Sequence, residues 1–280
     1  MHEKVIFFCN CQPRNEKSEW TAAAGIVELN NDIQHIKLTD LCGLCANDPG
    51  SLIRLIDQAE QVLLIACYPR AVNLLLQNAG IMNREKIRFF NLLEEDQTGL
   101  LSAIEEFKNE IPAPPGDQGL TADTGSSRLP GATELQSDPS WPAWYPVIDP
   151  SRCNQCGQCA DFCLFGVYRK SAEGVEVVNP GNCKNNCPAC ARICPGVAIV
   201  FPKYAGGGAI GGSDRVDEKS KTDRLRQDTD AILGDDIYKA LEQRKMKRRS
   251  IIREDSLQKA NKERDEALEQ ARATGDHPGL

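Results

Sequence analysis

The chain has 280 residues, 41% of them hydrophobic and 26% charged, and a net charge of −7 at pH 7. This length and composition suit two modest domains with hydrophobic cores, and the negative charge argues against a general nucleic-acid or membrane-surface binder. No apolar run approaches the roughly 18 residues that span a bilayer, and the short run 5–8 is too brief for a secretory signal. We therefore expect a protein of the reducing cytoplasm, where cysteines are not normally paired in disulfides.

The first 111 residues alternate between strand-like and helix-like segments. The apolar run 62–66 is typical of a strand buried on both faces of a sheet. The pattern predicts strands at 5–9, 33–38, 62–66 and 87–90, and helices over 20–29, 51–61, 71–79 and 100–107. Residues 1–111 are thus expected to form a cysteine-rich α/β domain with a small parallel sheet.

Three further regions follow. Residues 112–144 are dominated by Pro, Gly, Ser, Thr and Asp up to residue 140, which predicts a flexible linker. The rings of Trp141, Trp144 and Tyr145 are expected to cover the core of the next domain, residues 145–205. Residues 206–280 become highly charged, with a helical pattern over 257–273 and a basic cluster within 244–253. We interpret them as a solvated helical tail or as a docking arm that orders on a partner.

The domain at 145–205 holds eight cysteines in two runs of four. The runs are Cys153, Cys156, Cys159 and Cys163, and then Cys183, Cys187, Cys190 and Cys194. Three closely spaced cysteines can wrap three corners of a cubane, while the fourth thiolate comes from elsewhere in the chain. Structural zinc sites use two pairs of ligands, often with His, and none of the three histidines lies nearby. The spacing therefore predicts two [4Fe-4S] clusters.

These residues resemble the bacterial two-[4Fe-4S] ferredoxin family, in which the fourth cysteine of each run binds the other cluster. The resemblance implies an α+β, ferredoxin-like fold for residues 145–205. It also implies Cys153, Cys156, Cys159 and Cys194 as ligands of a first cluster, and Cys183, Cys187, Cys190 and Cys163 as ligands of a second. The chain departs from the family in having Leu164 after Cys163, where the family has proline, and one extra residue between Cys183 and Cys187.

The segment between the two runs has a pattern of its own. Residues 168–179, with Gly174 and alternating valines, predict an added hairpin. The aromatic residues nearby are interpreted as core packing around the clusters and not as electron relays. They are Phe162, Phe165, Tyr168 and Phe201.

Five more cysteines lie in the N-terminal domain. They are Cys9, Cys11, Cys42, Cys45 and Cys67. Two follow the first predicted strand, one follows the apolar strand 62–66, and Cys42 and Cys45 are expected in the loop after the second strand. Because the carboxyl ends of parallel strands share one edge, where ligands bind, we expect the five thiols to converge there.

The motifs Phe8-Cys-Asn-Cys11, Cys45-Ala-Asn-Asp-Pro-Gly50 and Ile65-Ala-Cys67-Tyr-Pro-Arg70 resemble the N-terminal iron–sulfur domain of the flavin-binding subunit of heterodisulfide reductase. That domain binds a [4Fe-4S] cluster, and the resemblance implies Cys9, Cys11, Cys45 and Cys67 as the ligands of a third cluster. Cys42 is an extra thiol and an alternative ligand in place of Cys9 or Cys11, and Tyr68 stands where the family has serine. The other interpretations are a redox dithiol of Cys42 and Cys45, a zinc site, or inert buried cysteines.

The chain shows no Walker A motif, no Ser/His/Asp arrangement and no flavin fingerprint. We therefore predict a non-catalytic electron-transfer protein, a subunit or partner of a low-potential oxidoreductase complex. Its expected partner is a redox protein or a catalytic oxidoreductase subunit, with no membrane insertion and no nucleic acid. The alternatives are a disulfide or persulfide reductase that uses the N-terminal dithiol, and a redox sensor whose basic tail binds nucleic acid.

Overall fold

The computed structural model describes residues 4–11, 18–110, 134–172, 174–214 and 254–273. The chain divides into two compact units, residues 1–143 and 144–280. Within the described part of the chain, no helix combines the length and apolar character needed to cross a bilayer. The basic cluster within 244–253 and most of the predicted linker lie outside the described residues.

The first unit is built on a five-stranded sheet in the order β4-β3-β1-β2-β5, and every neighbouring pair of strands is parallel. Its strands are β1 (Lys4–Cys9), β2 (Gln34–Leu38), β3 (Gln61–Ala66), β4 (Ile87–Asn91) and β5 (Glu134–Leu135). The central strands β1 and β3 are buried along almost their whole length, as their continuous apolar sequences require. The predicted α/β domain with a parallel sheet is confirmed.

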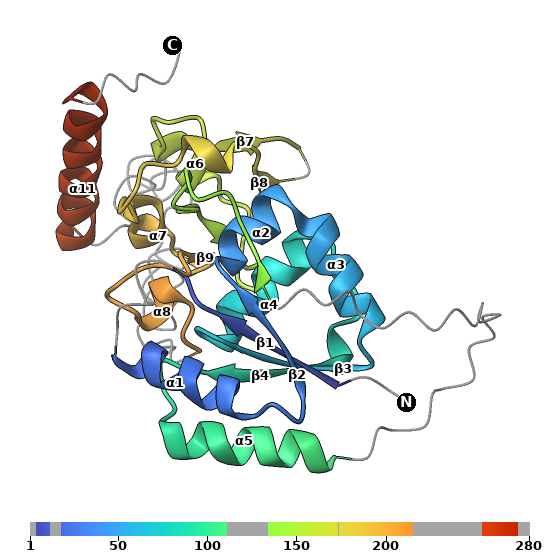
Figure 1. The fold of residues 1–280 in the computed structure, drawn as a ribbon. Coiled ribbons are helices and arrows are strands. Elements are labelled where there is room, and N and C mark those ends of the chain that lie inside the picture. The colour runs from blue at the N-terminus through green and yellow to red at the C-terminus, as the bar shows by residue number, and fades with distance from the viewer. Residues whose placement is uncertain (1–3, 12–17, 111–133, 173, 215–253, 274–280) are drawn as a thin grey trace, which may run out of the picture. The chain divides into compact units, whose positions relative to one another are not determined.

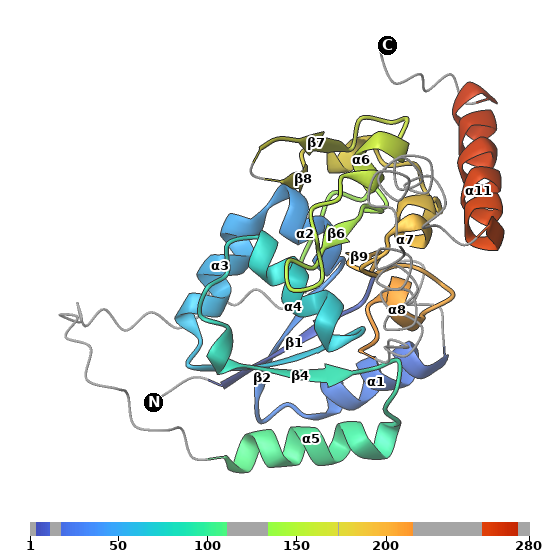
Figure 2. The same cartoon turned by 180° about the vertical axis from the view of Figure 1, so that it is seen from behind.

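Helices cover both faces of this sheet (Figures 1 and 2). On one face lie α1 (Ser18–Leu29) and α5 (Gln97–Asn109), which bury Trp20, Ile104 and Phe107 against strand side chains. On the other lie α3 (Pro49–Gln58) and α4 (Pro69–Asn78), each with proline in its first turn, where a missing N–H costs nothing. A short 3-10 turn, η1 (Arg84–Lys86), leads into β4.

The region of Cys42 and Cys45 corrects the sequence-based expectation of a loop. These residues lie in a seven-residue helix, α2 (Leu41–Asn47), which buries Leu41 and Leu44. Asp40 caps this helix, because its Oδ1 accepts a hydrogen bond from the Cys42 backbone N–H at 3.1 Å. With seven residues the helix is too short to show an apolar period in the sequence, and its one sequence signal is the N-cap residue Asp40.

The segment expected to be a linker also differs in part from expectation. Its residues 134–144 are described, and β5 adds to the sheet edge by pairing Leu135 with Leu38 of β2. Thr39 strengthens this edge, since its N–H donates to the Leu135 carbonyl and its hydroxyl accepts from the Ser137 N–H at 2.8 Å. Pairing with β2, which is distant in sequence, gives Glu134 and Leu135 a strand conformation that their own sequence does not predict.

The second unit consists of short elements joined by turns. Its strands form two antiparallel pairs, β6 (Val147–Ile148) with β9 (Ile199–Val200) and β7 (Tyr168–Lys170) with β8 (Val175–Val177). The second pair confirms the predicted hairpin. The helical elements are α6 (Gln158–Phe162), η2 (Pro180–Asn182), α7 (Ala189–Ile193), α8 (Gly208–Gly211) and α11 (Glu254–Ala273).

Aromatic side chains fill the core of this unit. Trp144 is buried and stacks on Phe201 with 5.1 Å between ring centroids, and Phe165 is buried in a neighbouring cluster. The interpretation as core packing is confirmed for Phe165 and Phe201, whereas Phe162 and Tyr168 are partly buried and pack against the cluster of Phe165. The C-terminal helix α11 lies beside α7 (Figure 1), with Ala260, Ala267 and Ala271 almost fully buried. The helix is thus packed on one face, and a fully solvated tail does not describe it.

Candidate metal centres

A first pocket in the second unit is lined by four cysteines. Cys153 and Cys156 lie in the loop before α6, Cys159 lies in α6, and Cys194 follows α7. Three of these thiols come from the first cysteine run, and the fourth comes from the end of the second. Cys156 is exposed to solvent and the other three are half-buried.

A second pocket mirrors this arrangement. Cys183, Cys187 and Cys190 of the second run line it together with Cys163, the last cysteine of the first run. Cys187 and Cys190 are buried. The structure therefore brings together the same two crosswise groups of four that the ferredoxin resemblance implies. Four thiols around each pocket fit the donor set of a [4Fe-4S] cluster, which needs one thiolate for each iron atom.

Left-handed backbone turns shape both cysteine loops. Gln155, directly before Cys156, has φ 58°, and Asn186, directly before Cys187, has φ 60°. The two loops thus turn at equivalent positions, and the extra residue of the second run is accommodated upstream of Asn186. Asn and Gly tolerate this conformation, whereas Gln155 is held in it by a hydrogen bond from the Val175 N–H to its Oε1 at 2.8 Å.

A close backbone approach joins the two halves of the first pocket. Asp149 starts a turn in which its carbonyl accepts the N–H groups of Arg152 and Cys153, at 3.2 and 3.0 Å. The Arg152 carbonyl then faces Gly196, where an added Cβ would lie 2.4 Å from its oxygen. Gly196 is therefore required for Cys194 to reach the loop of Cys153.

Burial and mutual repulsion oppose free thiolates at both pockets. Burial raises the pKa of Cys159 to about 12, with further contributions from Cys194, Cys156 and Cys153. Burial likewise raises the pKa of Cys183 and of Cys190. Four thiolates can share such a site only when a cationic group binds them, as the iron atoms of a cluster do.

Two hydrogen-bond donors lie near the pockets, where they can interact with the sulfur atoms of a cluster site. The Tyr168 hydroxyl donates to Cys190 Sγ at 3.1 Å. The indole N–H of Trp144 is buried without an acceptor among the described residues, in the same apolar cluster as Cys159 and Cys194. Hydrogen bonds to the sulfur atoms are one of the features that set the reduction potential of an iron–sulfur cluster.

The N-terminal cysteines lie at the carboxyl edge of the parallel sheet. From β1 the chain adds β2 on one side, and it then adds β3 and β4 on the other side of β1. The strand order therefore reverses between β1 and β3, and ligands of such sheets bind at this switch point. Cys9 ends β1, Cys11 follows it, and Cys67 follows β3. These three cysteines therefore flank the switch point from both sides.

The thiols converge only in part. A side-chain hydrogen bond with Cys11, burial, and the charges of Asp40 and Cys42 all raise the pKa of Cys9. Burial and the Asp40 charge raise the pKa of Cys45 to about 12. Among the described residues no three Cys, His, Asp or Glu side chains are close enough to share one metal ion. The thiolates of a cubane bind different iron atoms and stand farther apart.

Two residues of this region have roles that the sequence motifs do not reveal. The buried Trp20 of α1 donates its indole N–H to the Cys9 carbonyl at 2.8 Å and so holds the end of β1. The buried Asp40 caps α2 beside the thiols. From sequence, Trp20 is interpreted only as a core residue of a helix. Asp40 could have been found, because Asp directly before an apolar helical residue is an N-cap signal.

Comparison with known proteins finds relatives of the second unit. A family model described as a 4Fe-4S binding domain matches residues 146–166. The chain is 44% identical over 61 residues to an uncharacterised ferredoxin of Methanocaldococcus jannaschii, an overlap of 21% of this chain and 42% of that protein. It is 34% identical over 74 residues to the pyruvate synthase subunit PorD of Methanothermobacter marburgensis, which covers 26% of this chain and 85% of that subunit. The chain belongs to this ferredoxin-type family.

The PorD subunit of M. jannaschii is also similar, with 28% identity over 71 residues, 25% of this chain and 81% of that subunit. No solved structure matches the chain significantly. The chain spans about two fifths of the length of the M. jannaschii ferredoxin, so the likeness concerns a ferredoxin-type portion of each protein.

Proposed function

We propose that the chain is an electron carrier with two [4Fe-4S] clusters in its second unit. Cys153, Cys156, Cys159 and Cys194 bind the first cluster. The second is bound by Cys183, Cys187, Cys190 and Cys163. The observation that carries this proposal is the crosswise lining of the two pockets, three thiols from one run and one from the other.

The proposed carrier serves an oxidoreductase complex. Its PorD relatives are subunits of pyruvate synthase, and the likeness covers more than four fifths of their length. When bound, the clusters supply reversible one-electron storage. The residues of the chain hold them, limit water access through Trp144, Phe165 and Phe201, and present the exposed Cys156 side toward a partner.

A third cluster is proposed at the carboxyl edge of the N-terminal sheet, bound by Cys9, Cys11, Cys45 and Cys67, with Cys42 as an alternative ligand. The flanking of the switch point by Cys9, Cys11 and Cys67 supports it. A nucleophilic dithiol of Cys42 and Cys45 is less favoured, because burial raises the pKa of Cys45 to about 12, whereas reactive thiols have lowered pKa values.

Iron and acid-labile sulfide analysis of the anaerobically purified chain tests these proposals. About twelve of each per chain supports three cubanes, and about eight supports two. Fewer than eight would contradict the two-cluster carrier. Cys9→Ser, Cys11→Ser and Cys42→Ser, compared with one another, identify the N-terminal ligands, because each variant that removes a ligand loses about four iron atoms. For the partner, the reduced chain is tested as electron donor or acceptor with a pyruvate synthase that lacks its PorD subunit, and no exchange contradicts that assignment.

A further inference from the structure

The C-terminal helix α11 forms part of the wall of the second four-cysteine pocket. Arg264 of α11 lines this pocket together with Cys163, Cys183, Cys187 and Cys190. Ala260 and Ala267 of the same helix are buried in an apolar cluster that contains Phe165 and Ile193. The described wall of the first pocket has no such addition from α11.

An ion pair fixes the helix in this position. The guanidinium Nε of Arg192 in α7 lies 2.8 and 2.7 Å from the two carboxylate oxygens of Glu263, and another nitrogen of Arg192 donates to the Tyr204 hydroxyl at 2.8 Å. Both side chains of the pair are largely shielded, with 14% and 18% of their surfaces exposed, so the attraction is only weakly screened. The pair ties α11 to α7.

Arg264 places a second guanidinium beside this pocket, and its ion-pair partner Asp265 has an exposed carboxylate. Its guanidinium lies over the Phe162 ring, 4.8 Å from the centroid, and Phe162 lines the same pocket as Cys187. The Nε atom is buried and has no hydrogen-bond acceptor among the described residues, although Asp265 lies 3.5 Å away with an exposed carboxylate. Lys184, over the Phe165 ring, is a second cation on this side.

We propose that α11 is a structural component of the second cluster site, and that Arg264 raises the reduction potential of this cluster relative to the first. The inference rests on the two clusters of the proposed function. One-electron reduction adds a negative charge to the cluster and its thiolates, and a nearby fixed cation stabilises that added charge. The packed helix also excludes water, which strengthens the interaction. The first cluster site has the exposed Cys156 and no α11 residue in its described wall, so it is the site of electron exchange with the partner.

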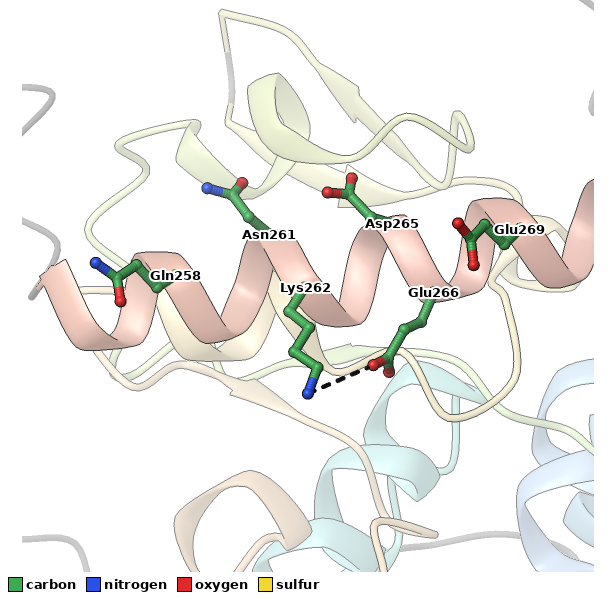
Figure 3. A pocket seen from close by; sticks show the side chains of 6 residues that line it. All are labelled: Gln258, Asn261, Lys262, Asp265, Glu266 and Glu269. Atoms are coloured by element: carbon green, nitrogen blue, oxygen red, sulfur yellow. Dashed lines mark ion pairs between the residues drawn. The ribbon is translucent and has the colours of Figure 1, made fainter.

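The opposite face of α11 supplies matched controls. It carries six polar side chains around a shallow surface pocket without any cysteine (Figure 3). Lys262 on this face pairs with Glu266 at 3.8 Å, and its side chain is 77% exposed. Lys262→Gln therefore removes the same charge as Arg264→Gln from the same helix, but from the solvent side. A second test, Ala260→Glu, adds a negative charge on the buried side of α11, and Gln258→Glu adds the same charge on the solvent side as its control.

The experiment is a potentiometric titration of the full-length chain, followed by electron paramagnetic resonance, after its iron content has been measured. Arg264→Gln should shift one of the two ferredoxin-type couples downward, so that its reduced-to-oxidised ratio falls about tenfold at a fixed potential, which is about 59 mV for one electron. Lys262→Gln should shift neither couple. Ala260→Glu should lower the same couple and speed the loss of iron to a chelator, whereas Gln258→Glu should do neither.

Unchanged couples in both Arg264→Gln and Ala260→Glu would overturn the proposal, as would an equal shift in Lys262→Gln. A wild-type chain with fewer than two clusters would instead show that the proposed function fails, because the iron content is determined before any titration.

Discussion

Gly196 provides a steric test of the first cluster site. Replacement by alanine places a Cβ 2.4 Å from the Arg152 carbonyl oxygen, closer than side-chain carbon atoms normally come to a backbone atom. This carbonyl has little freedom to move, because the N–H groups of Arg152 and Cys153 are both held by the Asp149 carbonyl. The two backbone segments must therefore separate by several tenths of an ångström.

Overpacking of this kind costs about 1–3 kcal/mol. In this position the separation acts directly on the site, because Cys194, two residues before Gly196, and Cys153 line the same pocket. We expect Gly196→Ala to lose the first cluster, which is about four iron atoms per chain, and to retain the second. The thermal unfolding temperature of the anaerobic protein should fall with it.

Gly181→Ala is the matched control, since its added Cβ meets no atom within 4 Å. This variant should keep the full iron and sulfide content and the wild-type unfolding temperature. Wild-type iron content in Gly196→Ala, measured beside this control, would refute the argument that close backbone contact assembles the first site.

Three further substitutions test individual contacts. Tyr168→Phe removes the hydroxyl that donates to Cys190 Sγ, and should lower the potential of the second cluster by at most about 60 mV, the equivalent of a hydrogen bond of about 1.4 kcal/mol; an upward shift in a redox titration would contradict this. Trp20→Phe removes the donor to the buried Cys9 carbonyl and should destabilise the first unit by about 1–3 kcal/mol, which denaturant unfolding measures; an unchanged midpoint would show that this bond adds no stability. Asp40→Ala removes the cap of α2 and should cost about 0.5–2 kcal/mol in the same assay, so a variant as stable as wild type would be inconsistent with a capping role.

Much of this protein follows from local sequence pattern. The strands of the first unit are predicted because apolar runs such as 62–66 are too short for a typical helix and alternate along the chain with helical patterns. The hairpin of β7 and β8 follows from alternating valines around Gly174. The crosswise grouping of the eight cysteines is expected from their spacing and the ferredoxin resemblance, since a short loop can reach only three corners of a cubane.

The remaining features depend on contacts between residues far apart in the chain. Leu135 becomes a strand residue because β2 offers a free edge, and Trp20 supports a cysteine site because α1 crosses the sheet to the end of β1. Only the strand order shows that Cys9 and Cys67 flank a switch point. Arg264 reads as one more charge on a solvated helix until α11 is seen against α7. The sequence period shows which face of α11 is apolar, but tertiary packing decides what that face contacts. Because the contact is with α7, Arg264 lies at the wall of a cysteine pocket.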